Sequence, residues 1–198
     1  MKVLLIGESG CGKSALFRQF NDGRFIDVNS KTIGKLLTPS RFTAVCLWLA
    51  GVAHGSKTVT VGGKILQIQT CDIGEIEPPS TIPIGYRDPE GIILVYDCTN
   101  QDSFDSLDKW VHAIKSCAGR APFVFLCANK SDLSDAKVVS VEQGKAKARD
   151  LGYEFFEVSA ATGDSVKKMF LTLAQQSCAQ KDDTEVQASS LLCHCTLF

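Results

Sequence analysis

Eight residues near the start of the chain combine glycines, a lysine and a serine in a pattern that suits phosphate binding. Residues 7–14 read Gly-Glu-Ser-Gly-Cys-Gly-Lys-Ser. The glycines permit backbone angles that other residues avoid, so successive N–H groups can surround a phosphate. The Lys13 ammonium would reach the β- and γ-phosphates of a nucleotide, and the Ser14 hydroxyl would bind the Mg²⁺ that bridges them. The residues predicted to hold phosphate are Ser9, Gly10, Cys11, Gly12, Lys13 and Ser14.

The neighbouring sequence supplies the strand and the helix that this loop requires. Residues 3–6, Val-Leu-Leu-Ile, form an apolar run typical of a buried strand, and residues 15–20 begin a helix. The N-terminus of a helix directs partial positive charge at a bound phosphate. A glycine turn that arose by chance would not need this context, so we interpret the motif as a nucleotide phosphate site.

A second group of polar residues follows a later strand and suits recognition of a base. Asn129-Lys130-Ser131-Asp132 closes the predicted strand 122–127, at the sheet edge where α/β proteins bind ligands. The Asp132 carboxylate can accept hydrogen bonds from two N–H groups of guanine, whereas adenine has an acceptor at one of these positions. Asp132 therefore favours GTP over ATP, although Asn-x-x-Asp by itself also fits a simple Asx turn.

The next predicted strand ends at the same edge with Val158-Ser159-Ala160-Ala161, where a backbone N–H would bind the guanine oxygen. Each of these motifs is weak alone, but together they follow three successive parallel strands. The residues predicted to bind the base are Asn129, Lys130, Asp132, Ser159, Ala160 and Ala161.

The wider pattern predicts the elements that position these motifs. Runs typical of strands span residues 2–6, 57–61, 64–70, 91–97, 122–127 and 154–158. Helical periodicity spans residues 103–117, 141–151 and 165–174. Apolar strands separated by helices indicate an α/β fold, namely a doubly wound, mostly parallel six-stranded sheet with helices on both faces. The turn Gly62-Gly63 predicts that an antiparallel hairpin forms one edge.

Length and composition indicate one domain with a tail. The 198 residues carry a net charge of −1, which implies no general attraction to nucleic acid. The nine cysteines are scattered and odd in number, so we expect reduced thiols in the cytosol rather than a disulfide framework. No apolar run reaches the roughly eighteen residues that span a bilayer. We expect a nucleotide-binding domain over residues 1–178 and a flexible tail over residues 179–198.

Together, the motifs resemble the Ras superfamily of small GTPases, and within it the Rab branch. The resemblance covers residues 1–34 and 57 to about 176. It implies the P-loop GTPase fold, a switch between bound GTP and GDP, and Mg²⁺ as cofactor. It places Phe25, twelve residues after Lys13, against the guanine ring. It gives Thr32, nineteen residues after Lys13, the roles of metal ligand and γ-phosphate sensor.

The resemblance also implies partners and a location. Rab proteins are bound by effectors in their GTP state, loaded by an exchange factor, switched off by a GTPase-activating protein and carried by a prenyl-binding chaperone or escort. We therefore expect a monomer in vesicle trafficking, at the cytoplasmic face of an intracellular membrane, with a cytosolic pool and no nucleic-acid partner.

The C-terminal sequence favours a lipid anchor. Cys195-Thr-Leu-Phe has the C-a-a-X form that is prenylated, and Cys193 completes a Cys-x-Cys pair of the kind that Rab proteins doubly prenylate. Two lipids hold a protein on a membrane stably. Stray cysteines are the alternative. A Cys-His-Cys metal site is disfavoured, because ligands so close in sequence cannot close a tetrahedron.

The first departure from the family is an insertion of about residues 35–56, between Thr32 and the predicted hairpin. Residues 44–50 alternate in a way that could form a strand, but almost all are apolar, which is unusual for an edge strand. Two interpretations stay open: a specialised effector surface that contains Trp48, or an unselected, disordered insertion.

The second departure lies in the sequence Cys71-Asp72-Ile73-Gly74-Glu75, which replaces the family's Asp-x-x-Gly-Gln. The resemblance to the family assigns Asp72 to the metal site and Gly74 and Glu75 to catalysis. Both assignments hold only if this loop is one residue shorter than the family's. Glutamate can only accept hydrogen bonds and is repelled by the γ-phosphate, so we expect slow GTP hydrolysis. The alternative is a pseudo-GTPase that binds nucleotide without cycling and acts as a membrane-tethered interaction module. A third hypothesis is an ATP-dependent kinase, but Asp132 argues against it because it favours GTP over ATP.

Overall fold

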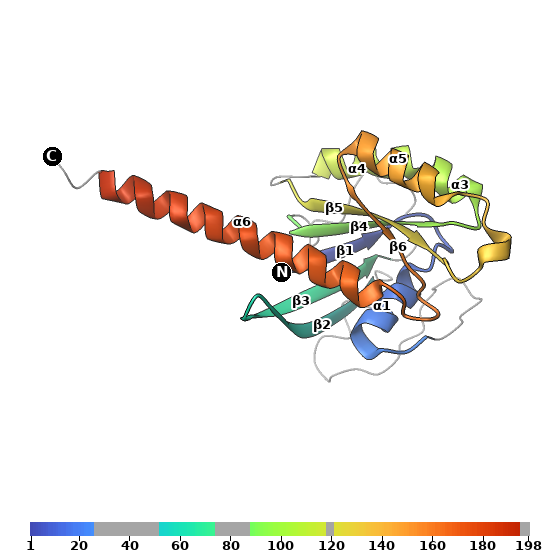
Figure 1. Cartoon of the computed structure of the whole chain (residues 1–198), viewed down its shortest axis with the longest axis horizontal. Coiled ribbons are helices and arrows are strands. Elements are labelled where there is room, and N and C mark those ends of the chain that lie inside the picture. The colour runs from blue at the N-terminus through green and yellow to red at the C-terminus, as the bar shows by residue number, and fades with distance from the viewer. Residues whose placement is uncertain (26–51, 74–87, 118–120, 195–198) are drawn as a thin grey trace.

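The computed structural model describes residues 1–25, 52–73, 88–117 and 121–194, with residues 52, 73, 116, 117 and 181–194 described by their backbone alone. Figure 1 shows the helices and strands in chain order. These are β1 Lys2–Ile6, α1 Lys13–Asp22, β2 Val52–Val61, β3 Lys64–Ile73, β4 Gly91–Asp97, α3 Gln101–Asp105, α4 Leu107–Cys117, β5 Phe123–Asn129, the 3₁₀ turn η3 Ser134–Ala136, α5 Val141–Leu151, β6 Glu154–Glu157 and α6 Val166–His194.

The six strands form one sheet in the order β2-β3-β1-β4-β5-β6. Strands β2 and β3 pair antiparallel, and the other four pairings are parallel. This confirms the predicted fold class, including the hairpin at one edge. In the parallel part, Ile6 is level with Leu94, and Asp97 is level with Asn129. The carboxyl ends of β1, β4 and β5 therefore open onto one edge of the sheet.

Alternating side chains of the strands feed two separate hydrophobic cores. Val3, Leu5 and Val95 point into the core that α1 and α6 cover, where Phe20 and Phe170 stack with their ring centroids 3.8 Å apart. Leu4, Ile6, Leu94 and Tyr96 point into the core that α4 and α5 cover. Figure 1 shows these two helical layers on opposite faces of the sheet. Strands buried on both faces explain the continuous apolar runs in the sequence.

The helix predicted over residues 103–117 is two helices, α3 and α4, separated at Ser106. The Asn100 side chain caps α3 by accepting from the Ser103 N–H at 3.2 Å. The Ser106 hydroxyl donates to the Ser103 carbonyl at 3.0 Å. Serine hydroxyls that bond to nearby backbone carbonyls compete with regular helix geometry. Apolar periodicity does not report this competition, which is why the pattern predicts one continuous helix.

Strand β2 begins at Val52, five residues before the predicted start at residue 57. Its added residues pair with an equally extended β3, from Val52 opposite Ile73 to Ser56 opposite Gln69. Residues 52–56 of the predicted insertion are therefore part of the edge strand. Backbone pairing with β3 supplies hydrogen bonds that the weak strand propensity of this segment does not signal. The rest of the insertion, with the strand considered at 44–50, lies outside the described residues.

Helix α6 continues to His194, whereas the sequence pattern predicts a flexible tail after residue 178. The segment 180–190 lacks an apolar stripe, but it contains neither glycine nor proline and is rich in residues that tolerate helix. Within residues 166–180, where the side chains of α6 are described, the buried ones are Val166, Met169, Phe170, Leu173, Ala174 and Ser177. No helix in the described part of the chain is both long and apolar enough to cross a bilayer.

Candidate nucleotide site

Close backbone approaches determine the shape of the loop between β1 and α1. Gly7 has φ 137°, and a Cβ at this position would lie 2.1 Å from the Val95 carbonyl oxygen. Gly12 has φ 87°, and a Cβ there would lie 2.3 Å from the Asn129 side-chain nitrogen. Only glycine fits both the angle and the space at these positions. The glycines of the motif thus serve close packing as well as the turn.

Lys13 is held inside the loop rather than in solvent. Its side chain is only 8% exposed. The Nζ donates to the carbonyl oxygen of Gly7 at 2.7 Å and to that of Glu8 at 2.8 Å. An ammonium can exchange a carbonyl for a phosphate oxygen at little cost, because both accept the same N–H. Lys13 is therefore already at the place where the sequence predicts a phosphate.

Helix α1 presents an uncapped N-terminus to this loop. Its N-cap is Gly12, which has no side chain to satisfy the first N–H groups. The first turn of α1 contains no acidic residue. The positive end of the helix dipole, with no capping side chain and no acidic residue beside it, favours an anion here.

Asn129, at the end of β5, connects the phosphate loop to the loop after β6. Its Nδ2 donates to the Cys11 carbonyl at 2.8 Å, and its Oδ1 accepts from the Ala160 N–H at 3.1 Å. The side chain is 1% exposed. Both ends of the amide are satisfied, so the three segments predicted to bind phosphate and base are brought together as one unit.

Asp132 and Ser159 meet at the predicted base site. Asp132 Oδ1 accepts from the Ser159 hydroxyl at 2.5 Å. The same hydroxyl accepts from the Thr162 N–H at 3.1 Å. These bonds fix the Asp132 carboxylate beside the loop that contains Ala160 and Ala161. The sequence prediction that these residues share one sheet edge agrees with this arrangement.

Asp97, which the sequence analysis did not select, positions Lys130. Asp97 Oδ2 lies 2.5 Å from Lys130 Nζ, and Oδ1 accepts from the N–H of Thr99 at 2.8 Å. Lys130 has a left-handed φ of 66°. Next to Asp97, the Cys98 N–H donates to the Asn129 carbonyl at 3.1 Å. Asp97 ends the predicted strand 91–97, so its place beside the end of the neighbouring strand was the available signal.

Asp72 lies on the metal side of the site, near the end of β3. Its side chain is 2% exposed, and burial raises the pKa of the carboxyl, against a hydrogen bond from Ser14 and the charge of Lys13. Its Oδ1 has no hydrogen-bond partner among the described residues. A buried carboxylate oxygen without a partner, beside a serine hydroxyl, fits a hard divalent cation such as Mg²⁺. The predicted ligands Ser14 and Asp72 are thus brought together.

Other predicted site residues are placed only in part. Phe25 follows α1 and is 44% exposed, so its ring is accessible. Thr32, Gly74, Glu75 and Cys195 lie outside the described residues. Cys193 lies in α6, where only its backbone is described. The metal, catalytic and lipid roles of these residues stay predictions.

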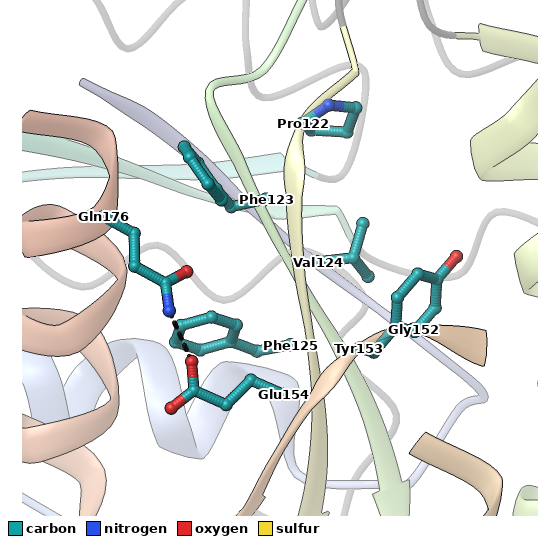
Figure 2. A pocket seen from close by; sticks show the side chains of 8 residues that line it. All are labelled: Pro122, Phe123, Val124, Phe125, Gly152, Tyr153, Glu154 and Gln176. Atoms are coloured by element: carbon teal, nitrogen blue, oxygen red, sulfur yellow. Dashed lines mark hydrogen bonds between the residues drawn. The ribbon is translucent and has the colours of Figure 1, made fainter. Parts of the chain in front are cut away.

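A pocket of about 260 Å³ lies at the other end of the sheet, and Figure 2 shows the side chains that line it. Phe123 and Glu154, which line it, begin β5 and β6. The Gln176 amide closes one side by donating to Glu154 Oε2 at 2.5 Å. None of the predicted site residues lines this pocket. It is separate from the nucleotide site, which lies at the carboxyl ends of the strands.

Comparisons with known proteins agree with this geometry. The family model described as "Ras family" matches residues 2–179. The chain is 36% identical to "GTP-binding protein ypt2" of Schizosaccharomyces pombe over 191 residues, which are 96% of this chain and 87% of that protein.

Two further relatives have similar coverage. "Ras-related protein RABD1" of Arabidopsis thaliana is 37% identical over 87% of this chain and 77% of its own length. "Ras-related protein SEC4" of Saccharomyces cerevisiae is 36% identical over 88% of this chain and 74% of its own length. The match extends across the sheet and all loops described above. The chain belongs to the Ras family and is a Rab-like small GTPase.

Proposed function

We propose that this chain is a guanine-nucleotide switch in vesicle trafficking that binds GTP and GDP together with Mg²⁺. The observation that carries the proposal is the connection of the phosphate loop to both base-binding loops through Asn129. The names of relatives such as "GTP-binding protein ypt2" point to the same ligand.

Each part of the site has a distinct task in this proposal. Lys13 and the N-terminus of α1 hold the phosphates, and Asp132 accepts the guanine N–H groups. Asp97 holds the Lys130 ammonium by an ion pair and so would position this side chain for the base. Ser14 and Asp72 would hold the metal ion. Bound Mg²⁺ would supply positive charge that offsets the phosphate oxygens.

Nucleotide selectivity tests the proposal directly. The purified chain should release a guanine nucleotide on denaturation, and it should bind GDP far more tightly than ADP. The expected difference is at least about a hundredfold, because adenine leaves the Asp132 carboxylate and the Ala160 N–H without matching partners. Equal affinity for ADP and GDP would contradict the proposal.

We also propose that GTP hydrolysis is slow, because Glu75 replaces the residue type that orients the attacking water. Glu75→Gln should raise the single-turnover rate about tenfold or more, since the amide donates where the carboxylate cannot. The control is Glu77→Gln, which removes the same charge two residues further along the chain and should leave the hydrolysis rate unchanged. If Glu75→Gln has no effect, Glu75 does not face the water.

Limited proteolysis separates the switch from a pseudo-GTPase. A switch changes conformation with the nucleotide, so protease cleavage within residues 32–80 should differ between GDP and a non-hydrolysable GTP analogue. Identical cleavage in both states would favour the interaction module that binds nucleotide without cycling.

We further propose a membrane anchor through Cys193 and Cys195, with GTP-state effectors, an exchange factor, a GTPase-activating protein and a prenyl-binding escort as partners. Mass spectrometry of protein isolated from eukaryotic cells should find prenyl groups on these cysteines. Cys193→Ser together with Cys195→Ser should move the chain into the soluble fraction. An unmodified C-terminus in the cell-derived protein would contradict the anchor.

A further inference from the structure

Trp110 and Glu8 make a contact that the proposed function does not use. The Trp110 indole N–H donates to Glu8 Oε1 at 3.3 Å. Glu8 is the second residue of the phosphate loop, whereas Trp110 comes from α4, on the other face of the sheet from α1. The hydrogen bond therefore joins the loop to a helix that contributes no predicted site residue.

The two partners differ in how firmly they are held. Trp110 is 6% exposed and packs in the core with Leu107, Val111 and Tyr96. Its ring cannot turn without disturbing that core. Glu8 is only half-buried, in a loop. The tryptophan is thus the fixed partner, and the position of the carboxylate depends on it.

Glu8 makes two contributions of opposite sign to an anion site. Its backbone carbonyl accepts from Lys13 Nζ at 2.8 Å and so helps to orient the lysine. Its side chain carries a negative charge in the loop that is to hold phosphates, and like charges at short range in a protein repel by about 1–4 kcal/mol. Affinity is preserved only if the carboxylate is held away from the phosphates.

We propose that Trp110 is a positioning residue for the phosphate loop. Its indole N–H holds the Glu8 carboxylate toward α4, so the loop can contain an acidic side chain without losing affinity for a nucleoside diphosphate. The inference rests on the proposed function, because it requires a nucleotide in this loop.

A charge-rescue experiment tests this role. Affinity for Mg²⁺·GDP is measured for the full chain, for Trp110→Phe, for Glu8→Gln and for the double variant. Trp110→Phe keeps most of the ring but removes the N–H, so it should weaken GDP binding about tenfold. Adding Glu8→Gln should restore the affinity to within about twofold of Glu8→Gln alone, since no charge is then left to repel the phosphates. The loss in Trp110→Phe should shrink at 1 M salt.

Tyr96→Phe is the matched control. It removes a polar group from another buried aromatic residue of the same core and leaves the Glu8 contact intact. It should bind GDP as the unmodified chain does. Thermal melting of each variant without nucleotide separates loss of packing from loss of affinity.

A spectroscopic measurement adds a readout that packing alone would not move. The chain contains two tryptophans, Trp48 and Trp110, so Trp48→Phe leaves Trp110 as the single indole. In that background, Glu8→Ala should shift the emission maximum, because the indole N–H loses its acceptor.

The outcomes are distinct. If Trp110→Phe binds GDP as tightly as the unmodified chain, or if Glu8→Gln does not rescue it, the positioning role is wrong while the proposed function stands. If the unmodified chain binds no guanine nucleotide, the proposed function fails and the inference fails with it.

Discussion

On the base side of the nucleotide site, Asn129 and Asp132 have hydrogen-bond partners within the protein, whereas on the metal side one oxygen of the Asp72 carboxylate has none among the described residues. Asn129 and Asp72 are equally inaccessible, at 1% and 2% exposure, so the difference between these two is not one of access to water, whereas Asp132 is exposed. On the base side, protein groups hold one another in place through these hydrogen bonds. The metal side contains a buried carboxylate with one oxygen that lacks a partner among the described residues, which costs stability unless a cation binds there.

This difference gives opposite expectations for similar substitutions. A side chain that the protein itself satisfies stabilises the empty site, and its removal should weaken both folding and binding. A buried polar side chain that has no partner within the protein destabilises the fold unless a ligand is bound. Its removal should therefore raise the free energy of unfolding and lower the affinity for the ligand.

The largest effect is expected at Asn129. Asn129→Ala leaves the Cys11 carbonyl and the Ala160 N–H buried without partners, at a combined cost of about 2–4 kcal/mol. GDP affinity should fall at least about a hundredfold, measured by titration calorimetry. Asn100→Ala, which removes one side-chain cap at the same edge of the sheet, should leave GDP affinity nearly unchanged. Equal losses in both variants would mean that Asn129 has no special role.

A change of base preference is expected at Asp132. Asp132→Asn keeps an oxygen for the Ser159 hydroxyl but replaces an acceptor with an N–H₂ donor. GDP binding should weaken about 10–100-fold, because a charged hydrogen bond is lost and two donors oppose each other. Xanthosine diphosphate, which has a carbonyl where guanine has an amino group, should bind the variant better than it binds the unmodified chain. Unchanged preference would place Asp132 away from the base.

The opposite sign is expected at Asp72. Asp72→Asn removes a buried charge with almost no change of shape. The nucleotide-free protein should become more stable, by about 1 kcal/mol in denaturant unfolding. At the same time, Mg²⁺ should no longer slow the dissociation of GDP. A loss of stability without nucleotide would show that the Asp72 carboxylate is already satisfied, and the contrast with Asn129 would disappear.

The smallest effect is expected at the far end of the sheet. Gln176→Ala removes the exposed hydrogen bond to Glu154 beside the pocket of Figure 2. The free energy of unfolding should change by less than about 0.5 kcal/mol, and GDP affinity should not change. A measurable loss of affinity would couple the two ends of the sheet.

The arrangement of the described residues agrees with the sequence prediction where backbone motifs determine it. Gly7 and Gly12 require their backbone angles, Lys13 and Asp132 have distinctive spacing, and buried strands deliver both motifs to one edge. Strand ends indicate which residues lie at the same edge, as for Asp97, but not the specific contacts between side chains of distant elements. Asp97 beside Lys130 and Trp110 beside Glu8 depend on strand register and helix packing, which a single sequence does not specify.

Element boundaries show the same limit. The predicted helix 103–117 is interrupted at Ser106 by hydroxyl-to-carbonyl bonding, and β2 extends to Val52 through pairing with β3. In both cases local hydrogen bonds override the apolar pattern. The chain beyond Gln180 is helical although it has no apolar stripe. Residue propensity accounts for this helix, whereas apolar periodicity predicted a flexible tail.

The length of α6 has a consequence for how the molecule would face a membrane. The helix has 29 residues, or about 43 Å at 1.5 Å per residue, and Figure 1 shows it extending past the amino ends of the strands. A lipid attached just beyond His194 would therefore pull on the side of the domain opposite the nucleotide. The helix would separate the domain from the membrane. The bound nucleotide would then face away from the membrane, toward proteins that approach from solution.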